Sequence, residues 1–246
     1  MLNSTFDTLR PILFNDTVIN ETNEIKSLWL TITQNLSWDS HIYNCISKAS
    51  KRLFVLRSYR NLLPRQALTT IYTSLIRPVI EFGDVIYDSG TLSIGHQIEQ
   101  FQRQAAIICS GAYRHTKYES LLNELGWESL SSRRRQHKLV LFYKILKKIY
   151  PSYLYNFIHF KHIGQYNLRR PQEIVPRFTR LSLTTRSYFP STTRDWNKLP
   201  TSVQNSLSIV TFKSLLKIHQ FKSLLQTLHW SQRYLVVQTP YGAESP

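Results

Sequence analysis

Few residues in this chain could perform metal-dependent chemistry. The densest acidic group is Glu81, Asp84 and Asp88 in EFGDVIYD, whose gaps of three and four residues would place all three on one face of a helix. Metal catalysis needs carboxylates or imidazoles brought together, and no further Asp or Glu follows until Glu99. We therefore interpret this group as a solvated helix end and not as a magnesium site.

Other catalytic signatures are missing. His159 and His162 could offer two ligands on one turn, but no third ligand lies nearby in the sequence, so we interpret them as surface histidines. The chain has no G-x-S-x-G, G-x-G-x-x-G, GK[ST] or C-x-x-C, and only 7 glycines. We expect no catalytic residue, no metal and no cofactor.

The distribution of charge is more informative. The net charge is +16, and residues 1–128 hold 12 Lys or Arg and 12 Asp or Glu, whereas residues 129–246 hold 19 and 3. A field this one-sided favours a polyanion, usually nucleic acid. A basic membrane-surface role is the alternative, but the basic residues alternate with turn and strand signals. No apolar run approaches the roughly 20 residues of a membrane span, so we expect no membrane insertion.

Arginine and aromatic residues alternate in YNLRRPQ, VPRFTR and TTRSYFPSTTRDW. Basic groups neutralise phosphates and aromatic rings stack on unpaired bases. The alternative is that the aromatic residues are core and the arginines a solvated face. The candidate nucleic-acid-binding residues are Lys48, Lys51, Arg52, Arg133, Arg134, Arg135, Lys138, Arg169, Arg170, Arg177 and Arg180.

The elements that must position these residues begin with a small β-unit over 1–36. Asn15 and Asp16 form a turn signal between two apolar runs. The stretch KSLWLTI, residues 26–32, alternates as one strand. Its apolar face would carry Leu28, Leu30 and Ile32, and Trp29 would lie on the other face.

Three helices with short connections predict a small bundle over 37–112. The first helix, of roughly 25 residues, starts at Ser37 or Asp39 and carries Lys48, Lys51 and Arg52 on its flank. Its apolar stripe is Ile42, Cys45, Ile46, Ala49, Leu53 and Leu56. A second helix covers 66–77 after Pro64, and Pro78 ends or kinks it. A third covers 92–109 and stops at Ser110-Gly111.

The remaining chain divides into a basic helical region, 113–160, and a basic C-terminal region, 161–246. A helix over 131–150 would bury Leu139, Phe142, Leu146 and Ile149. A second hairpin is expected at about 174 to 189, and a last helix at 209–228. The fold class is therefore mainly α, with a small N-terminal β-hairpin and a second hairpin in the C-terminal half.

The two cysteines, Cys45 and Cys109, both lie in helix-like apolar patterns. We expect buried thiols in a reducing compartment. The first 14 residues lack the pattern of a secretory signal, so an intracellular location, cytoplasmic or nuclear, is expected.

Several segments together resemble a family. NLSWDSHI, KASKRLFVLRSYRNLLP, LTTIYTSLIRPVIEFG, QRQAAIICSGAYRHT and LLNELGWESLSSRRRQHKLVLFYKI, followed by RSYFPSTTRDWNKLPTSV and FKSLL, are similar to the region after the catalytic palm in jockey-like non-LTR retrotransposon reverse transcriptases. The resemblance extends over roughly residues 11–225. It implies an end-of-palm, primer-grip-like hairpin over 1–36 and a thumb-like bundle over 37–112.

The resemblance also implies what is lost. The family's polymerase activity depends on palm aspartates, typically in an F/Y-A-D-D motif, and this chain has no adjacent aspartate pair. In such polymerases the first thumb helix packs against the template–primer duplex, which by position points to Lys48, Lys51 and Arg52 as phosphate contacts. KSLWLTI is similar to a K-x-L-G hairpin in which Trp29 replaces glycine, so we expect the indole to obstruct close approach of a primer.

The resemblance thus implies a non-catalytic fragment that retains binding of RNA or an RNA/DNA duplex. The alternatives are a helical protein-interaction module, or a decayed element product with no selected function.

Overall fold

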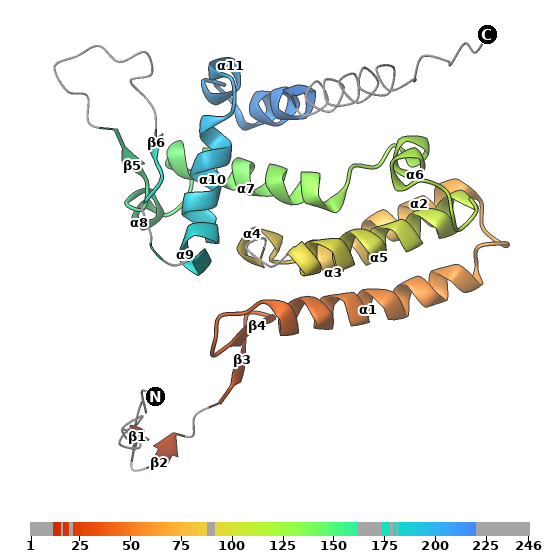
Figure 1. The fold of residues 1–246 in the computed structure, drawn as a ribbon, viewed down its shortest axis with the longest axis horizontal. Helices are drawn as coiled ribbons and strands as arrows, with labels where there is room; N and C mark the ends of the chain where they lie inside the picture. The colour runs from red at the N-terminus through yellow and green to blue at the C-terminus, as the bar shows by residue number, and fades with distance from the viewer. Residues whose placement is uncertain are drawn as a thin grey trace, which may run out of the picture. The chain divides into compact units, whose positions relative to one another are not determined.

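Secondary structure and packing are taken from a computed structural model that describes residues 12–15, 17–19, 22–87, 92–161, 174–177, 180 and 182–219. The chain forms two compact units, 1–83 with 90–113 and 84–89 with 114–246. The described chain is mainly helical with small antiparallel two-stranded sheets, which confirms the predicted fold class (Figure 1).

The first unit begins with two hairpins. Strands β1 (Ile12–Phe14) and β2 (Thr17–Ile19) are antiparallel, and Asn15 between them has φ +47°, which confirms the predicted turn. Strands β3 (Glu24–Ser27) and β4 (Leu30–Thr33) form the second hairpin. The prediction of a single strand over 26–32 was therefore wrong.

The chain reverses at Leu28 and Trp29, whose φ angles are +48° and +68°. A two-residue loop with both central φ angles positive is a type I′ turn, which normally takes Asn-Gly. The side chains of Leu28 and Trp29 are 86% and 83% exposed. Trp29 therefore extends from the hairpin tip instead of lying on one face of a strand. Beyond the turn, β4 buries Thr31 and not its apolar neighbours.

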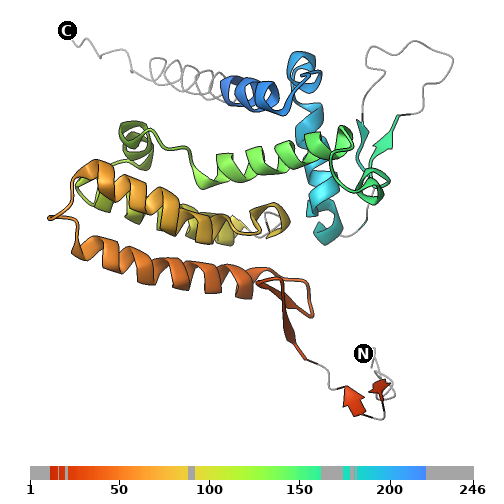
Figure 2. The same ribbon diagram turned by 180° about the vertical axis from the view of Figure 1, so that it is seen from behind.

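Three helical segments follow the predicted bundle closely. Helix α1 (Asp39–Ser58) buries its predicted stripe, except for the half-buried Ile46. It packs against α3 (Arg77–Glu81) and α5 (Leu92–Ser110) (Figures 1 and 2). Helix α5 ends as predicted, because Gly111 has φ +72° and its N–H donates to the Ile107 carbonyl at 3.0 Å.

The second helix passes Pro78 instead of ending there. Helix α2 (Arg65–Ile71) continues into a π-helical turn, η1 (Tyr72–Ile76), and then into α3. The Arg77 N–H donates to the Tyr72 carbonyl, five residues back. Proline lacks an N–H and clashes with the carbonyl four residues back in a regular α-helix. The wider turn allows the helical path to continue to Glu81.

The second unit contains the short helix α4 (Asp84–Tyr87), then α6 (Tyr118–Leu125) and α7 (Leu130–Leu146). Residues 84–89 lie inside the predicted bundle span of 37–112, yet they belong to this unit. Helix α8 (Ser152–Tyr155), α9 (Ser182–Arg186), α10 (Tyr188–Asn197) and α11 (Thr201–Gln204) follow, and residues 209–219 are also helical. The predicted helical residues 220–228 lie outside the described chain.

A two-stranded sheet is present in the C-terminal half, but its strands differ from those of the predicted hairpin. Strand β5 (His159–Phe160) pairs with β6 (Ile174–Val175). The later part of the predicted hairpin span of 174–189 instead forms α9 and the start of α10. The Ser187 and Ser191 hydroxyls bond to backbone carbonyls three residues back, and Pro190 lies in the first turn of α10, where proline is tolerated.

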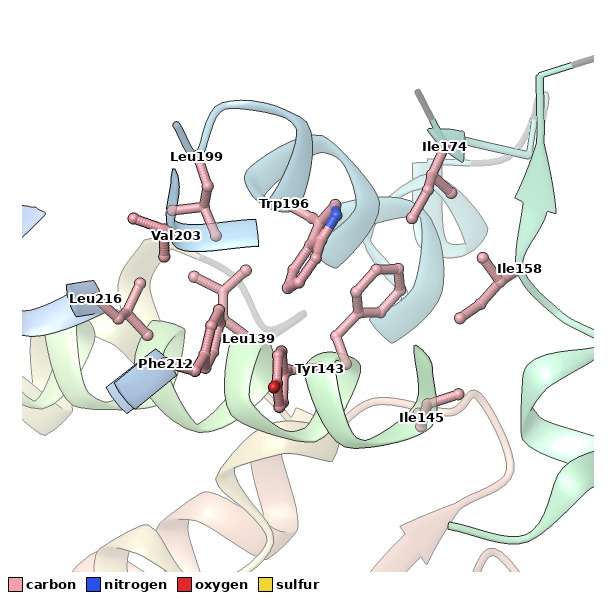
Figure 3. Packing of buried hydrophobic residues seen from close by; sticks show 11 residues of the cluster. Leu139, Tyr143, Ile145, Ile158, Ile174, Trp196, Leu199, Val203, Phe212 and Leu216 are labelled. Atoms are coloured by element: carbon pink, nitrogen blue, oxygen red, sulfur yellow. The ribbon is translucent and has the colours of Figure 1, made fainter. Parts of the chain in front are cut away.

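A cluster of buried hydrophobic residues packs α7 against later elements of the second unit (Figure 3). Trp196 lies 5.4 Å from the Phe142 ring and 5.7 Å from the Phe212 ring, and Tyr143 stacks on Phe212 at 4.4 Å. Trp196, from the TTRDW motif, is therefore core and not a stacking surface. Leu139 and Phe142 are buried as predicted. Leu146 is half-buried, and Ile149 is 63% exposed because α7 ends at Leu146.

Candidate nucleic-acid interface

The predicted basic residues of α1 lie on its solvent side. Lys48, Lys51 and Arg52 are all exposed, and Lys48 and Arg52 flank the buried stripe, as predicted. The Arg52 Nη1 donates to the Leu75 carbonyl at 2.5 Å, so part of its guanidinium is already engaged by a neighbouring helical turn. Lys48 and Lys51 remain the open cations of this face.

The predicted residues of α7 do not form an open basic face. Arg134 and Lys138 are each only 6% exposed, because α7 is buried on several sides. Their long stems contribute to packing. The sequence interpretation treated them as surface phosphate contacts, and for these two residues it was wrong. Arg133 is half-buried, and Arg135 lies 3.6 Å from the Asp195 carboxylate.

Four predicted nucleic-acid-binding residues remain, and the structure describes two of them. Arg177 and Arg180 are exposed. Arg169 and Arg170 lie outside the described residues.

A group of three lysines at the C-terminal end of α7 was not among the predicted site residues. The Lys144 Nζ lies 5.3 Å from the Tyr150 ring centroid, the Lys147 Nζ 5.6 Å from Tyr143, and the Lys148 Nζ 5.2 Å from Tyr155. These are cation–π distances. The signal was present in KLVLFYKILKKIYPSYLY, where tyrosines flank the lysines.

Backbone hydrogen bonds at the C-terminal end of α7 set the position of the lysines there. The Lys148 N–H donates to the Ile145 carbonyl and the Ile149 N–H to the Lys144 carbonyl, both at 3.0 Å. These are the two bonds of a Schellman motif. Lys148 has φ +56° at the position that glycine usually takes. The chain therefore turns sharply here and leads into α8.

The lysines have few opposite charges near them in sequence. No Asp or Glu occurs between Glu128 and Glu173. Within the part of the chain that the structure describes, none of the three lysines forms an ion pair, and Asp195 is engaged by Arg135 and by Lys198 at 4.0 Å. Exposed aromatic residues follow the lysines in sequence: Tyr150, Tyr153, Phe157 and Phe160.

Two histidine side chains make polar contacts, one in each unit. In the first unit, His41 Nδ1 accepts from the Thr31 N–H at 3.4 Å, and Nε2 lies 3.6 Å from the Cys45 Sγ. Burial lowers the pKa of His41, and the Lys48 charge acts in the same direction. The Thr31–His41 hydrogen bond connects β4 with α1. Gly83, at φ +75°, lies so near Leu30 that a Cβ there would clash.

In the second unit, His137 Nδ1 lies 2.6 Å from Asp84 Oδ2, and the Asp84 side chain is 5% exposed. The expectation that Asp84 is part of a solvated helix end was therefore wrong, because α4 packs against α7. In the first unit, Glu81 instead lies 3.6 Å from the Arg77 guanidinium, and Asp88 lies outside the described residues. His159 is exposed as expected, and His162 lies outside the described residues.

Both cysteines are buried free thiols, as predicted. Burial raises the pKa of Cys45, and it raises the pKa of Cys109 to about 12. Among the described residues, no group of three or more His, Cys, Asp or Glu side chains is arranged to hold a metal ion. No helix in the described ranges has both the length and the apolar character needed to cross a membrane.

Comparisons with protein-family models, with curated proteins and with solved structures find no match.

Proposed function

We propose that this chain binds nucleic acid, RNA or an RNA/DNA duplex, without catalysing a reaction. On this proposal it is a non-catalytic relative of the region after the palm in non-LTR retrotransposon reverse transcriptases. A nucleic-acid partner would place its action inside the cell, in the cytoplasm or nucleus. The observation that carries the proposal is the group of Lys144, Lys147 and Lys148, held over tyrosine rings and not against carboxylates.

A lysine held over an aromatic face keeps its charge, and its contact costs only part of its hydration. Each such ammonium can neutralise one phosphate and release its condensed counterion. Lysines near a helix C-terminus also interact favourably with the helix dipole. The dipole accounts for basic residues in the last turn, but it does not account for a segment of the chain from 129 to 172 without a single carboxylate.

Lys48 and Lys51 on α1 supply a second exposed basic face, in the other unit. The resemblance assigns this helix to the duplex-facing position of a thumb. Arg134 and Lys138 are excluded from the proposed contacts because they are buried.

The proposal is tested by fluorescence anisotropy of the full chain with a labelled RNA/DNA duplex at several salt concentrations. Contact with four to eight phosphates gives a log–log slope of affinity against salt of roughly −3 to −7. A flat slope, or no binding at low salt, would refute it. Magnesium-dependent primer extension is expected to be absent, and templated incorporation above background would overturn the non-catalytic part.

A helical protein-interaction module is the second candidate, and one observation favours it. On the outer side of α1, Phe54 is 72% exposed and Val55 54%, and Leu62 just beyond the helix is 76% exposed. Such a surface is typical of a partner-binding face. Binding of a protein partner through it would persist at salt concentrations that release nucleic acid.

A further inference from the structure

We propose that Lys148, Tyr155 and Phe160, here called the lysine–aromatic array, form a stacking site for single-stranded nucleic acid. This inference rests on the proposed nucleic-acid binding and adds to it a class of ligand. The array joins the end of α7, helix α8 and strand β5, all within the second unit.

The three side chains are connected by measured contacts. The Lys148 Nζ lies 5.2 Å from the centroid of the Tyr155 ring. The Tyr155 ring lies 5.8 Å from the Phe160 ring, with 38° between their planes. Phe160 is 46% exposed, and the neighbouring Lys161 is exposed as well. A cation, a half-buried ring and an exposed ring therefore follow one another along this surface.

The backbone under the array is held in place. Lys148 is fixed by the Schellman bonds at the end of α7, and Phe160 is paired with the buried Ile174 in the β5–β6 sheet. Between them, the Ile158 N–H donates to the Tyr155 carbonyl at 3.0 Å, and the Ile158 side chain is buried. A surface that is already ordered pays less conformational entropy on binding.

The exposed aromatic rings favour single-stranded over double-stranded nucleic acid as the ligand. Lysines alone contact the phosphates of either form. In a duplex the faces of the bases are stacked on one another, so only an unpaired base can offer its face to Phe160. Tyr153 and Phe157, which are 62% and 51% exposed, add further aromatic surface on the same short segment. Phe157 is itself supported by stacking on Phe189 at 5.2 Å.

The test measures binding of the full chain to a labelled oligo(dT) strand and to a duplex of equal length. Phe160→Leu keeps an apolar side chain in the sheet but removes the ring, and Phe160→Trp restores a larger ring. Tyr113→Leu is the matched control, since Tyr113 is 89% exposed and lies in the first unit. Poly-L-glutamate serves as a competitor that carries charge without bases.

We expect Phe160→Leu to weaken oligo(dT) binding about tenfold and duplex binding less than twofold. Phe160→Trp should bind oligo(dT) at least as tightly as the wild type, and Tyr113→Leu should be unchanged. Equal loss of both ligands, unchanged oligo(dT) binding by Phe160→Leu, or displacement of oligo(dT) by equal charge of poly-L-glutamate would overturn the inference. If the wild type binds duplex with a steep salt slope while Phe160→Leu has no effect, the stacking site is refuted and the proposed function stands.

Discussion

Replacing the tip of the β3–β4 hairpin should stabilise it. Leu28 and Trp29 hold positive φ angles of +48° and +68°, and such a conformation costs an L-residue roughly 1–2 kcal/mol. Leu28→Asn with Trp29→Gly removes most of this cost, while glycine adds about 0.5–1 kcal/mol of chain entropy. The lost side chains are 86% and 83% exposed, so little burial is forfeited. The net gain is about 1–3 kcal/mol.

Hydrogen exchange of the β3 and β4 amides measures this gain locally. A gain of about 1.4 kcal/mol slows exchange roughly tenfold when exchange follows local opening. Phe54→Gly in α1 is the control, because Phe54 is also highly exposed, at 72%, but lies in a right-handed helical turn. There glycine should destabilise the helix by roughly 0.5 kcal/mol relative to phenylalanine and so speed exchange of the α1 amides about twofold. Exchange in the hairpin that is unchanged or faster in the double variant would refute the turn geometry.

Three further predictions concern buried polar groups. Burial lowers the pKa of His41, so as the pH falls the unfolded chain binds a proton at this position before the folded chain does. The free energy of unfolding should therefore decrease as the pH drops below about 6.5. In urea titrations, His41→Gln should make the midpoint depend less on pH. Asp84→Ala should lower the free energy of unfolding by about 1–3 kcal/mol in urea titrations, because His137 loses its partner; an unchanged midpoint would contradict the contact. Burial raises the pKa of Cys109 to about 12, so only about 10⁻⁴ of this thiol is ionised at pH 8. Cys109 should therefore react with a thiol reagent only after the chain unfolds. Rapid labelling of the native chain would contradict its burial.

The features that could be predicted from sequence are those set by local pattern. The stripe of α1 repeats at helical spacing, and all but one of its residues are buried because one apolar face must pack. The end of α5 follows from Gly111, whose φ of +72° few other residues adopt readily. The buried thiols likewise follow from apolar helical surroundings.

The structural features that the sequence did not predict depend on contacts between residues distant in sequence, or on residues that are unusual for the local structure they adopt. Leu-Trp is a poor type I′ turn, so the two loop residues carried no local turn signal for the β3–β4 hairpin. Strand β6 pairs with β5 across a separation of 14 residues, between Phe160 and Ile174, which two-residue strands do not encode. Arg134 and Lys138 look like a solvated face in sequence, and only the packing around α7 shows that they are buried.

The central claim is that Lys144, Lys147 and Lys148 neutralise phosphates. Its most direct test compares the salt dependence of single-strand binding by the wild type and by the variant Lys144→Gln, Lys147→Gln, Lys148→Gln. Losing three phosphate contacts should make the log–log slope less negative by about two, since each contributes roughly 0.7 on a single strand. The same slope in both proteins would contradict the claim.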